Sequence, residues 1–507
     1  MKFIKKVFCL SIPLWLFSLP VFGLSVDEKL ALQWERYNQA QLILIDKVGK
    51  QNQVISREEW EKAISLPAES KWTKEDLAIL NERHLEIIEN NRQEATRRSN
   101  NLVDLDKIRK SKKVNQFCNE LPKGGMLHIH PWGTMDSDTV RAILEVVDPS
   151  LNVPQDPVLF DFKNSPFQDE IGFLSKYNIS NISYRDLSEE DQKAFQELFF
   201  LSGEHYEFDR FLGVFGLVFN LFWQNKEAWE NQGAKGPEDI LWRDLFSRSK
   251  EQKLKYLEIT RNIKPNRIWM IEALDRLAEN AEKEYGIIVR FVAQFSRMKS
   301  DEENRKALQL LIPHLESPYL VGINLVDDET ENPALEKGEG LYGTLLATEK
   351  TGLSKTIHAG EFGDVRNVRD AMIMGADRVG HGVTLIKDPV ALEYAIKKKL
   401  PIEVNLVSNQ KLGVLEKAGI AKHPFLDFLR LGLQVSLSTD DEGIFDTTIS
   451  NECVIAISTT DISYYELKQM ALNSIETSFV EKKIKDRLLK TLQSDLRKFE
   501  SGWALYR

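Results

Sequence analysis

Short apolar runs with the length and residue types of strands recur along the chain from about residue 125, and each is followed by a helical or loop stretch. Eight such runs occur, at residues 125–130, 256–260, 287–294, 320–326, 355–361, 378–382, 402–407 and 434–441. Eight βα units predict an α/β fold whose strands close into a (β/α)₈ barrel of the TIM type. An open sheet is disfavoured, because the glycine-rich phosphate loop GxGxxG and the P-loop pattern are both missing.

Before the first of these runs, the apolar residues are spaced as in helices. Residues 26–115 predict a helical N-terminal appendage, and residues 116–507 the barrel domain. Helices are expected to start at Ser56 and Thr73, which are both followed by acidic residues. His84 falls on one of these helices, where a surface or hydrogen-bonded structural histidine is expected.

One connection between the predicted strands is oversized. It runs from about Pro131 to Lys255 and contains an aromatic-rich segment at 204–223. This length exceeds a single crossover helix, so the chain is expected to carry a large insertion after the first strand. The helices of the insertion are expected to cover the barrel mouth, where a substrate would enter.

The start of the chain has the pattern of a signal peptide. A basic beginning precedes an almost unbroken apolar run from Val7 to Phe22, which ends in Gly23. A retained membrane anchor is the alternative, but the run is short for a span and contains two prolines. We therefore expect a signal peptide at residues 1–25, a secreted or periplasmic protein, and no stable membrane association after cleavage.

The net charge limits the class of binding partner, and the cysteine content bears on disulfide formation. The net charge of -10 argues against nucleic acid as a partner, whereas a small neutral ligand remains open. Cys9 lies in the predicted signal peptide. The remaining pair, Cys118 and Cys453, can form a disulfide in an oxidising compartment or remain as buried thiols.

Metal-ligating side chains gather at the predicted C-terminal ends of the strands. His128 and His130 are two residues apart on the first strand, so their side chains point the same way. His358 ends the fifth strand and Asp440 the eighth. Three imidazole nitrogens and one carboxylate oxygen suit Zn²⁺, and barrel enzymes carry their chemistry at this rim. One zinc ion per chain is therefore predicted.

Further polar residues on the same rim can act on a substrate. Glu361 can serve as general acid and base, and the alternative is an exposed loop carboxylate. His381 can orient an activated water or stabilise developing charge, and the alternative is a structural histidine. Asp441 diverges from Asp440 and can accept a hydrogen bond from a substrate. Together the residues predict a hydrolase that uses a metal-activated water.

Five motifs, PKGGMLHIH, TIHAGE, RVGHG, IEVNLVSN and VSLSTDD, resemble in this order those of the adenosine deaminase family of metal-dependent hydrolases. The resemblance spans about residues 121–445. The helices before the barrel and the signal peptide are similar to the secreted branch, the adenosine deaminase-related growth factors. The resemblance to the family implies zinc-dependent hydrolytic deamination of adenosine or 2′-deoxyadenosine to inosine and ammonia. The resemblance to the secreted branch implies a homodimer formed through the N-terminal helices.

The resemblance also implies roles for single residues. Glu361 would give a proton to purine N1 while hydroxide on the zinc adds to C6, and His381 and Asp440 would steer that hydroxide. Asp441 would bind N7. Zinc would be held by His128, His130, His358 and Asp440.

The pocket departs from the family pattern. Trp132 replaces an aspartate that binds the ribose 5′-hydroxyl in the intracellular enzymes, and tryptophan cannot accept that hydrogen bond. Asp327 replaces a glycine whose N–H bonds to purine N3. With Gly133, these residues are expected to line the substrate pocket. Asn324 replaces a usual aspartate, with no effect assigned.

These departures leave the substrate open. The alternatives are a deaminase of a modified adenine nucleoside, a hydrolase of another amidine-like or phosphoester compound, and a secreted nucleoside-binding or signalling protein without turnover. Asp441 and the HAGE stretch disfavour the second of these. The complete set of metal and proton-transfer residues disfavours the third.

Overall fold

The computed structural model describes residues 24–50, 55–148, 150–151, 182–201, 203, 208–223, 236–262, 269–329, 351–415 and 419–506. Apart from its last two residues, the predicted signal peptide lies outside the described residues. No helix of the described ranges has the length and apolarity to cross a membrane.

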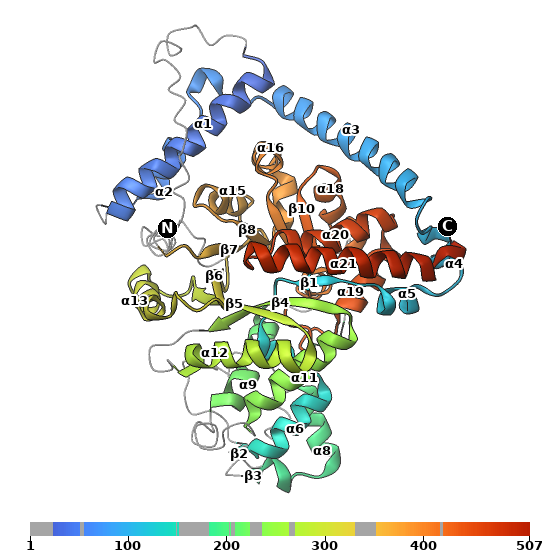
Figure 1. Cartoon of the computed structure of the whole chain (residues 1–507). Helices are drawn as coiled ribbons and strands as arrows, with labels where there is room; N and C mark the ends of the chain where they lie inside the picture. Colours follow the sequence, from blue (N-terminus) through green and yellow to red (C-terminus); the bar gives the residue numbers. More distant parts are fainter. Residues whose placement is uncertain are drawn as a thin grey trace.

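Eight parallel strands form one sheet in the order β1-β4-β5-β6-β7-β8-β9-β10 (Figure 1). Each strand coincides with one of the eight apolar runs, and most strand residues are buried. The strands are β1 (Gly124–Met126), β4 (Leu254–Asn262), β5 (Ile288–Ser296), β6 (Leu320–Val326), β7 (Ser354–Ala359), β8 (Arg378–His381), β9 (Pro401–Val404) and β10 (Gln434–Leu437).

The first and last strands meet just beyond their C-terminal ends. Ile129 forms a parallel bridge with Asp440. The Asp440 N–H donates to the His128 carbonyl at 3.2 Å, and the His130 N–H donates to the Asp440 carbonyl at 3.4 Å. These bonds join the two edges of the sheet, so the prediction of a (β/α)₈ barrel is confirmed.

Helices surround the strands. Most of them follow a strand and pack an apolar face on the barrel, as Val368 and Met372 of α15 do. The helices after β4 are α12 (Trp269–Asn280), α13 (Asp301–Leu311), α15 (Arg366–Ile373), α16 (Pro389–Lys398), α17 (Leu406–Lys411), α18 (Phe425–Arg430), α19 (Ile449–Thr459), α20 (Tyr464–Glu476) and α21 (Lys482–Gly502).

In the described part of the chain, five α-helices precede β1, as the apolar spacing predicts. Ser56 and Thr73 are the N-caps of α2 and α3 in complete capping boxes, which confirms both predicted starts. His84 is buried and its Nε2 lies 3.0 Å from Glu393 Oε1, so it is a hydrogen-bonded structural histidine. The helices are α1 (Val26–Leu44), α2 (Arg57–Ile64), α3 (Lys74–Ser99), α4 (Leu105–Lys110) and α5 (Val114–Glu120).

These N-terminal helices cross the outer side of the barrel. In Figure 1, α1 and α3 (blue) lie over α15, α16 and α18 (orange), and contacts join α1 to α15 and α3 to α18. Helix α5 spans the predicted domain boundary at residue 115. The division into appendage and barrel domain therefore stays a prediction.

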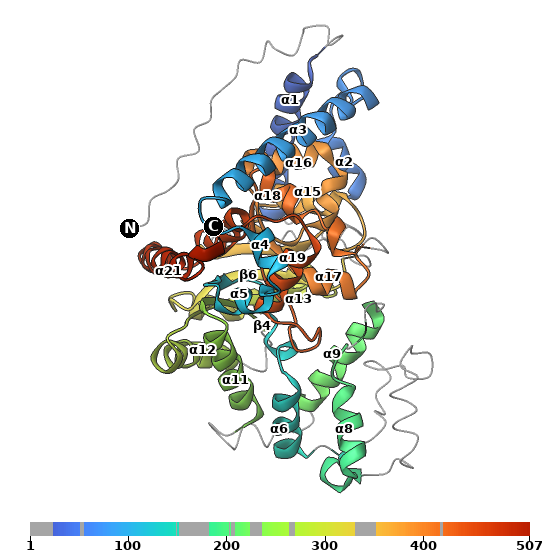
Figure 2. The same cartoon turned by 90° about the vertical axis from the view of Figure 1, so that its right-hand side faces the viewer.

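The connection between β1 and β4 forms the expected insertion. In Figure 2 its helices lie on the side of the barrel away from α1 and α3. Phe208, Phe211 and Phe215 of α9 line a cavity at the barrel mouth, so α9 covers the mouth as expected. The described elements are α6 (Ser137–Val147), the antiparallel strand pair β2 (Ser150–Leu151) and β3 (Ile182–Ser183), α8 (Glu189–Glu197), α9 (Phe208–Trp223) and α11 (Pro237–Glu251).

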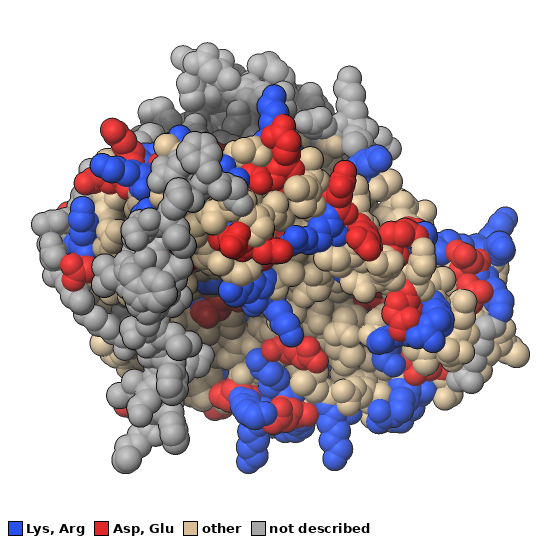
Figure 3. Space-filling view, turned by 90° about the horizontal axis from the view of Figure 1, so that it is seen from above, with Lys and Arg blue, Asp and Glu red and all other residues tan. Residues whose placement is uncertain are grey.

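The described surface mixes charges of both signs. On the face shown in Figure 3, basic and acidic side chains alternate over short distances. This agrees with the many ion pairs between neighbouring turns of the exposed helices, such as Arg97 with Glu94. The absence of a nucleic acid partner stays a prediction.

Cys118 of α5 and Cys453 of α19 form a disulfide, with their Cα atoms 5.8 Å apart. Both residues are buried. The bond links a helix that precedes the barrel to a helix that follows its last strand, across 335 residues of sequence. The alternative of two unpaired thiols is therefore not what the structure contains.

We expect replacement of both cysteines by alanine to lower the free energy of unfolding by about 2–4 kcal/mol, because a cross-link over a long loop restricts the unfolded chain. Urea unfolding of the two proteins without reductant measures this. Dithiothreitol should lower the midpoint of the unaltered protein and leave that of the variant unchanged. An unchanged midpoint in the unaltered protein would show that the thiols are free in solution.

Candidate active site

The rim residues singled out in the sequence come together at the barrel mouth. A cavity of about 550 Å³, counting space open to solvent, is lined by His130, His358, Glu361, His381, Asp440 and Asp441. Asp327 and the aromatic side chains of α9 form further parts of its wall. His128 lies fully buried beneath, with its ring centroid 4.4 Å from that of His358.

Three of the four predicted metal ligands, His128, His130 and Asp440, form a compact donor set, whereas His358 groups with His128 and His381. Three distances are equal: His128 Nε2 to His130 Nε2, and each of these nitrogens to Asp440 Oδ1, all 3.4 Å. Ligand atoms at about 2.0–2.1 Å from a tetrahedral zinc ion are themselves about 3.4 Å apart. The geometry therefore fits one metal ion, and His358 lies beside this triangle.

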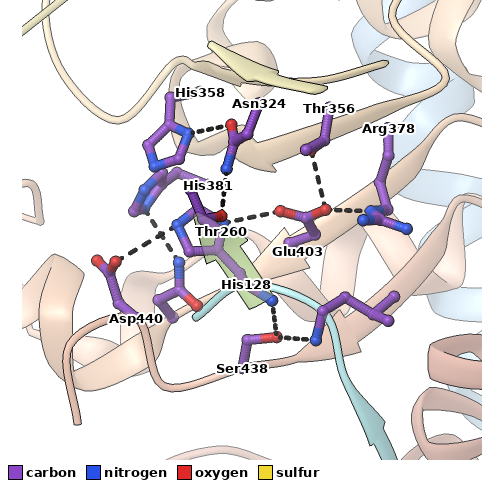
Figure 4. A network of polar contacts seen from close by, with 12 residues as sticks. His128, Thr260, Asn324, Thr356, His358, Arg378, His381, Glu403, Ser438 and Asp440 are labelled. Atoms are coloured by element: carbon purple, nitrogen blue, oxygen red, sulfur yellow. Dashed lines mark hydrogen bonds and ion pairs between the residues drawn. The ribbon is translucent and has the colours of Figure 1, made fainter. Parts of the chain in front are cut away.

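His128 is held from behind by a buried charged network (Figure 4). Its Nδ1 lies 2.7 Å from Glu403 Oε2, and Glu403 also bonds to Arg378. Burial raises the pKa of Glu403, but Arg378 and His128 outweigh burial and lower this pKa to about 2. The ionised carboxylate can only accept, so His128 carries a proton on Nδ1, and this bond directs its Nε2 toward the candidate metal site.

His358 has a neutral partner instead. Its Nδ1 lies 3.0 Å from Asn324 Oδ1, and the Asn324 amide donates to Thr260 Oγ1 at 2.9 Å (Figure 4). All three side chains are buried. The carbonyl oxygen of Asn324 accepts the Nδ1 proton, which again leaves Nε2 of His358 free for a metal. This contact gives Asn324 the role that the sequence left unassigned.

Glu361 follows β7 in a loop that a second carboxylate holds in place. Buried Glu329 accepts from the backbone N–H groups on both sides of Glu361, those of Gly360 at 2.9 Å and Phe362 at 2.6 Å. Burial raises the pKa of Glu361 well above its ordinary value, and the negative charges of Asp440 and Glu329 raise it further. The structure thus favours the protonated form, which is the form a general acid needs.

His381 ends β8 and faces the cavity. Its Nδ1 lies 3.0 Å from Asn409 Nδ2 and 3.4 Å from Glu361 Oε1, whereas its Nε2 is buried without a partner among the described residues. Burial lowers the pKa of His381 to about 3, so the ring is neutral.

Asp441 lies against Gly133. A Cβ atom on Gly133 would lie 1.8 Å from Asp441 Oδ1, so glycine is required for this approach. Asp441 Oδ1 is buried and has no partner among the described residues. Burial raises the pKa of Asp441 well above its ordinary value, and the charge of Asp440 adds to this.

Of the four residues predicted to contact substrate, two line the cavity and two do not. Asp441 and Asp327 line the cavity, and Asp327 is open to solvent there. Trp132 and Gly133 are buried, and neither is part of the cavity wall in the described structure. Gly133 can therefore act on a ligand through Asp441, while the predicted contact of Trp132 with substrate stays a prediction.

Three residues at strand ends have left-handed backbones: Asp327 (φ 76°), His381 (φ 64°) and Asp440 (φ 63°). Residues other than glycine adopt this region at a cost of about 1–3 kcal/mol each. Such strain persists where the surrounding structure enforces it, and it clusters at functional sites. His381 ends β8, and Asp327 and Asp440 lie just beyond the ends of β6 and β10, so these three strained residues lie at the rim that carries the candidate site.

Sequence reasoning missed the residues behind the rim, namely Glu403, Arg378, Glu329 and Asn409. Arg378 and Glu403 each stand in an apolar strand run, and a charged residue at such a position is a signal for a buried ion pair. Glu329 lies in a loop and Asn409 in the short helix α17, and neither position gives a comparable signal.

Comparison with known proteins agrees with this geometry. The sequence model of the adenosine deaminase family matches residues 180–495. An adenine deaminase of Marinomonas is 31% identical over 225 residues, which cover 44% of this chain and 65% of that protein. An adenosine deaminase of Enterococcus faecalis is 29% identical over 206 residues, 40% of this chain and 58% of that protein. Both alignments thus span less than two thirds of the relative.

A solved structure shows the same fold. An amidohydrolase from Burkholderia ambifaria with bound zinc superimposes with a TM-score of 0.59 at 18% identity, over 77% of this chain and 94% of that chain. The family match extends over more than half of the sequence and includes four of the five quoted motifs. The chain belongs to the adenosine deaminase family.

Proposed function

We propose that this protein is a zinc-dependent aminohydrolase that converts adenosine or 2′-deoxyadenosine to the inosine nucleoside and ammonia. One observation carries the proposal. Several features meet at a single cavity. They are a metal donor set with tetrahedral spacing, the Glu361 carboxyl group with its raised pKa, and two buried polar atoms without a described partner, His381 Nε2 and Asp441 Oδ1.

The zinc ion would be held by His128, His130, His358 and Asp440. Bound there, zinc supplies Lewis acidity that makes water a nucleophile near neutral pH. Ser408 Oγ donates to Asp440 Oδ2 at 2.7 Å, which leaves the other oxygen, Oδ1, toward the histidines.

Glu361 and Asp441 would bind the purine ring through their protonated forms. N1 and N7 of adenine both carry lone pairs, so each needs a donor, and a carboxyl group donates only when it is protonated. The raised pKa values of both groups meet this need. Glu361 then transfers its proton to N1 as the C6 carbon is attacked, and Asp441 holds the base in place through N7.

The cavity favours an uncharged nucleoside over a nucleotide. Its described lining contains several carboxylates and no lysine or arginine. A 5′-phosphate beside the Asp327 carboxylate would meet negative charge, and no lysine or arginine of the described lining would pair with it. Asp327 is the observation that favours the second candidate, a deaminase of a modified adenine nucleoside, because its exposed carboxylate can accept a hydrogen bond that adenosine does not require.

A secreted or periplasmic location in the growth-factor branch is part of the proposal. The buried disulfide suits an oxidising compartment, and the apolar start of the sequence suits export. A homodimer through the N-terminal helices is proposed as well. The support for it is that Leu42 of α1 and Ile79 and Leu85 of α3 are large apolar side chains on the surface.

The direct test is turnover. Zinc-loaded protein should release inosine from adenosine and 2′-deoxyinosine from 2′-deoxyadenosine, and a chelator should abolish both reactions until zinc is restored. Adenosine 5′-monophosphate is the matched comparison and should react far more slowly. If zinc-loaded protein converts neither nucleoside, the proposed function is wrong.

Replacement Glu361→Gln should keep zinc bound but lower kcat by about 10²- to 10⁴-fold, because an amide cannot deliver the proton to N1. In the unaltered protein, kcat should fall as the pH rises through the raised pKa of Glu361, since the acid form is consumed. Metal analysis and a pH profile of both proteins measure these effects. Substantial turnover by the variant would remove Glu361 from the proton-transfer step.

Replacement Gly133→Ala should raise KM, because the new methyl group occupies the position of Asp441 Oδ1 and displaces the carboxyl group that binds N7. We expect kcat/KM to fall by about 10- to 100-fold, as for loss of one hydrogen bond to a polar substrate group. Gly502→Ala is the control, since no atom lies within 4 Å of a Cβ at that position. Equal KM values for the two variants would contradict the predicted role of Asp441.

A further inference from the structure

The position of the proton on His381 decides what this residue can do. His128 and His358 each direct Nδ1 at an oxygen, which places the proton there and frees Nε2 for a metal. His381 differs, since the nearest partner of its Nδ1 is a nitrogen, Asn409 Nδ2 at 3.0 Å, and the Glu361 Oε1 oxygen is farther away at 3.4 Å. The orientation of the Asn409 amide therefore determines which nitrogen of His381 is protonated.

A backbone group fixes the first bond of the chain that leads to His381. The Phe425 N–H donates to His423 Nδ1 at 3.1 Å, and a backbone N–H can act only as donor. His423 Nδ1 is thus the acceptor. Because the ring is buried, which lowers the pKa of His423 to about 3, it is neutral and its one proton is on Nε2.

The second and third bonds follow from the first. His423 Nε2 lies 3.1 Å from Asn409 Oδ1 and donates to it. The amide group of Asn409 then turns its NH₂ toward His381 Nδ1 at 3.0 Å, and toward Glu361 Oε1 at 3.4 Å. Two N–H groups cannot face each other, so Nδ1 of His381 accepts. Asn405 Nδ2, at 3.4 Å from the same nitrogen, acts in the same sense.

We propose that His423 and Asn409 are positioning residues that keep the proton of His381 on Nε2. That nitrogen is the buried, unpartnered atom at the cavity, so His381 presents an N–H donor to the oxygen that reacts with the substrate. In this state it is neither a metal ligand nor a base. The assignment separates His381 from the predicted zinc ligands, although its ring lies beside those of His128 and His358 and the three could share a metal ion by distance alone.

The chain of bonds is shielded from water. His423, Asn409 and His381 are at most 5% exposed. Water therefore cannot replace a lost partner. A reversal of donor and acceptor in one hydrogen bond would reverse the next bond as well. Of the three residues, only His381 borders the cavity.

The decisive variant is Asn409→Asp, which has the same shape but only acceptor oxygens. It should draw a proton to Nδ1 of His381, which can be observed by ¹⁵N NMR of histidine-labelled protein, with the ring assigned through His381→Gln. The inference rests on the proposed function for its catalytic consequence. We expect kcat to fall by about 10²- to 10⁴-fold, as for a misplaced histidine tautomer, with KM and bound zinc nearly unchanged.

A matched pair at His423 tests the relay without adding charge. His423→Gln keeps an N–H donor for Asn409 and should retain most of kcat, whereas His423→Leu removes the donor and should lose it, both with zinc bound. This pair also decides the matter if Asn409→Asp fails to fold.

An unprotonated Nδ1 of His381 in Asn409→Asp, or equal kcat values for the two His423 variants, would overturn the inference. Absence of turnover in the unaltered protein, together with the expected NMR signals, would instead overturn the proposed function and leave the proton assignment standing.

Discussion

The backbone hydrogen bonds between His130, His128 and Asp440 close the barrel. The same bonds bring these three predicted metal ligands next to one another. Without them, β1 and β10 would be free edges, and the ligands they carry would belong to opposite ends of an open sheet. Asp440 adopts a left-handed backbone at this joint, so the closure and the position of its carboxylate are coupled. The metal site therefore depends on the barrel as a whole and not on a local motif.

Many charged side chains are buried inside the barrel, and each needs a partner of opposite charge or a hydrogen bond. Arg378 is fully buried between Glu258, at 2.5 Å, and Glu403, and its guanidinium lies 3.9 Å from the centre of the Phe479 ring. An unpaired charge in this place would cost several kcal/mol. The network thus has two functions, since it neutralises charge inside the barrel and keeps Glu403 ionised for His128.

The features of this molecule that can be predicted from the sequence are those with a regular spacing of residues along the chain. Eight apolar runs predict eight strands, and the spacing of two between His128 and His130 predicts their shared direction. Ser56 and Thr73 mark helix starts because capping chemistry is local. His423 and Asn409 follow no period, because their partners are set by packing between α17 and the start of α18. Trp132 and Gly133 were placed in the pocket by resemblance, whereas the structure shows Gly133 supporting Asp441 from behind.

The arrangement of carboxyl groups is the strongest argument for the purine. Burial raises the pKa of Asp440, but the interaction with His128 outweighs burial and lowers this pKa, so Asp440 remains ionised. Burial raises the pKa values of Glu361 and Asp441 well above their ordinary values, and the charge of Asp440 raises them further, which favours the protonated forms. One site thus contains an anionic ligand for a metal and two neutral donors beside it, with environments that drive the pKa values apart. The 6-aminopurine of the proposed substrate offers two such lone pairs, N1 next to the attacked C6 carbon and N7 on the neighbouring ring.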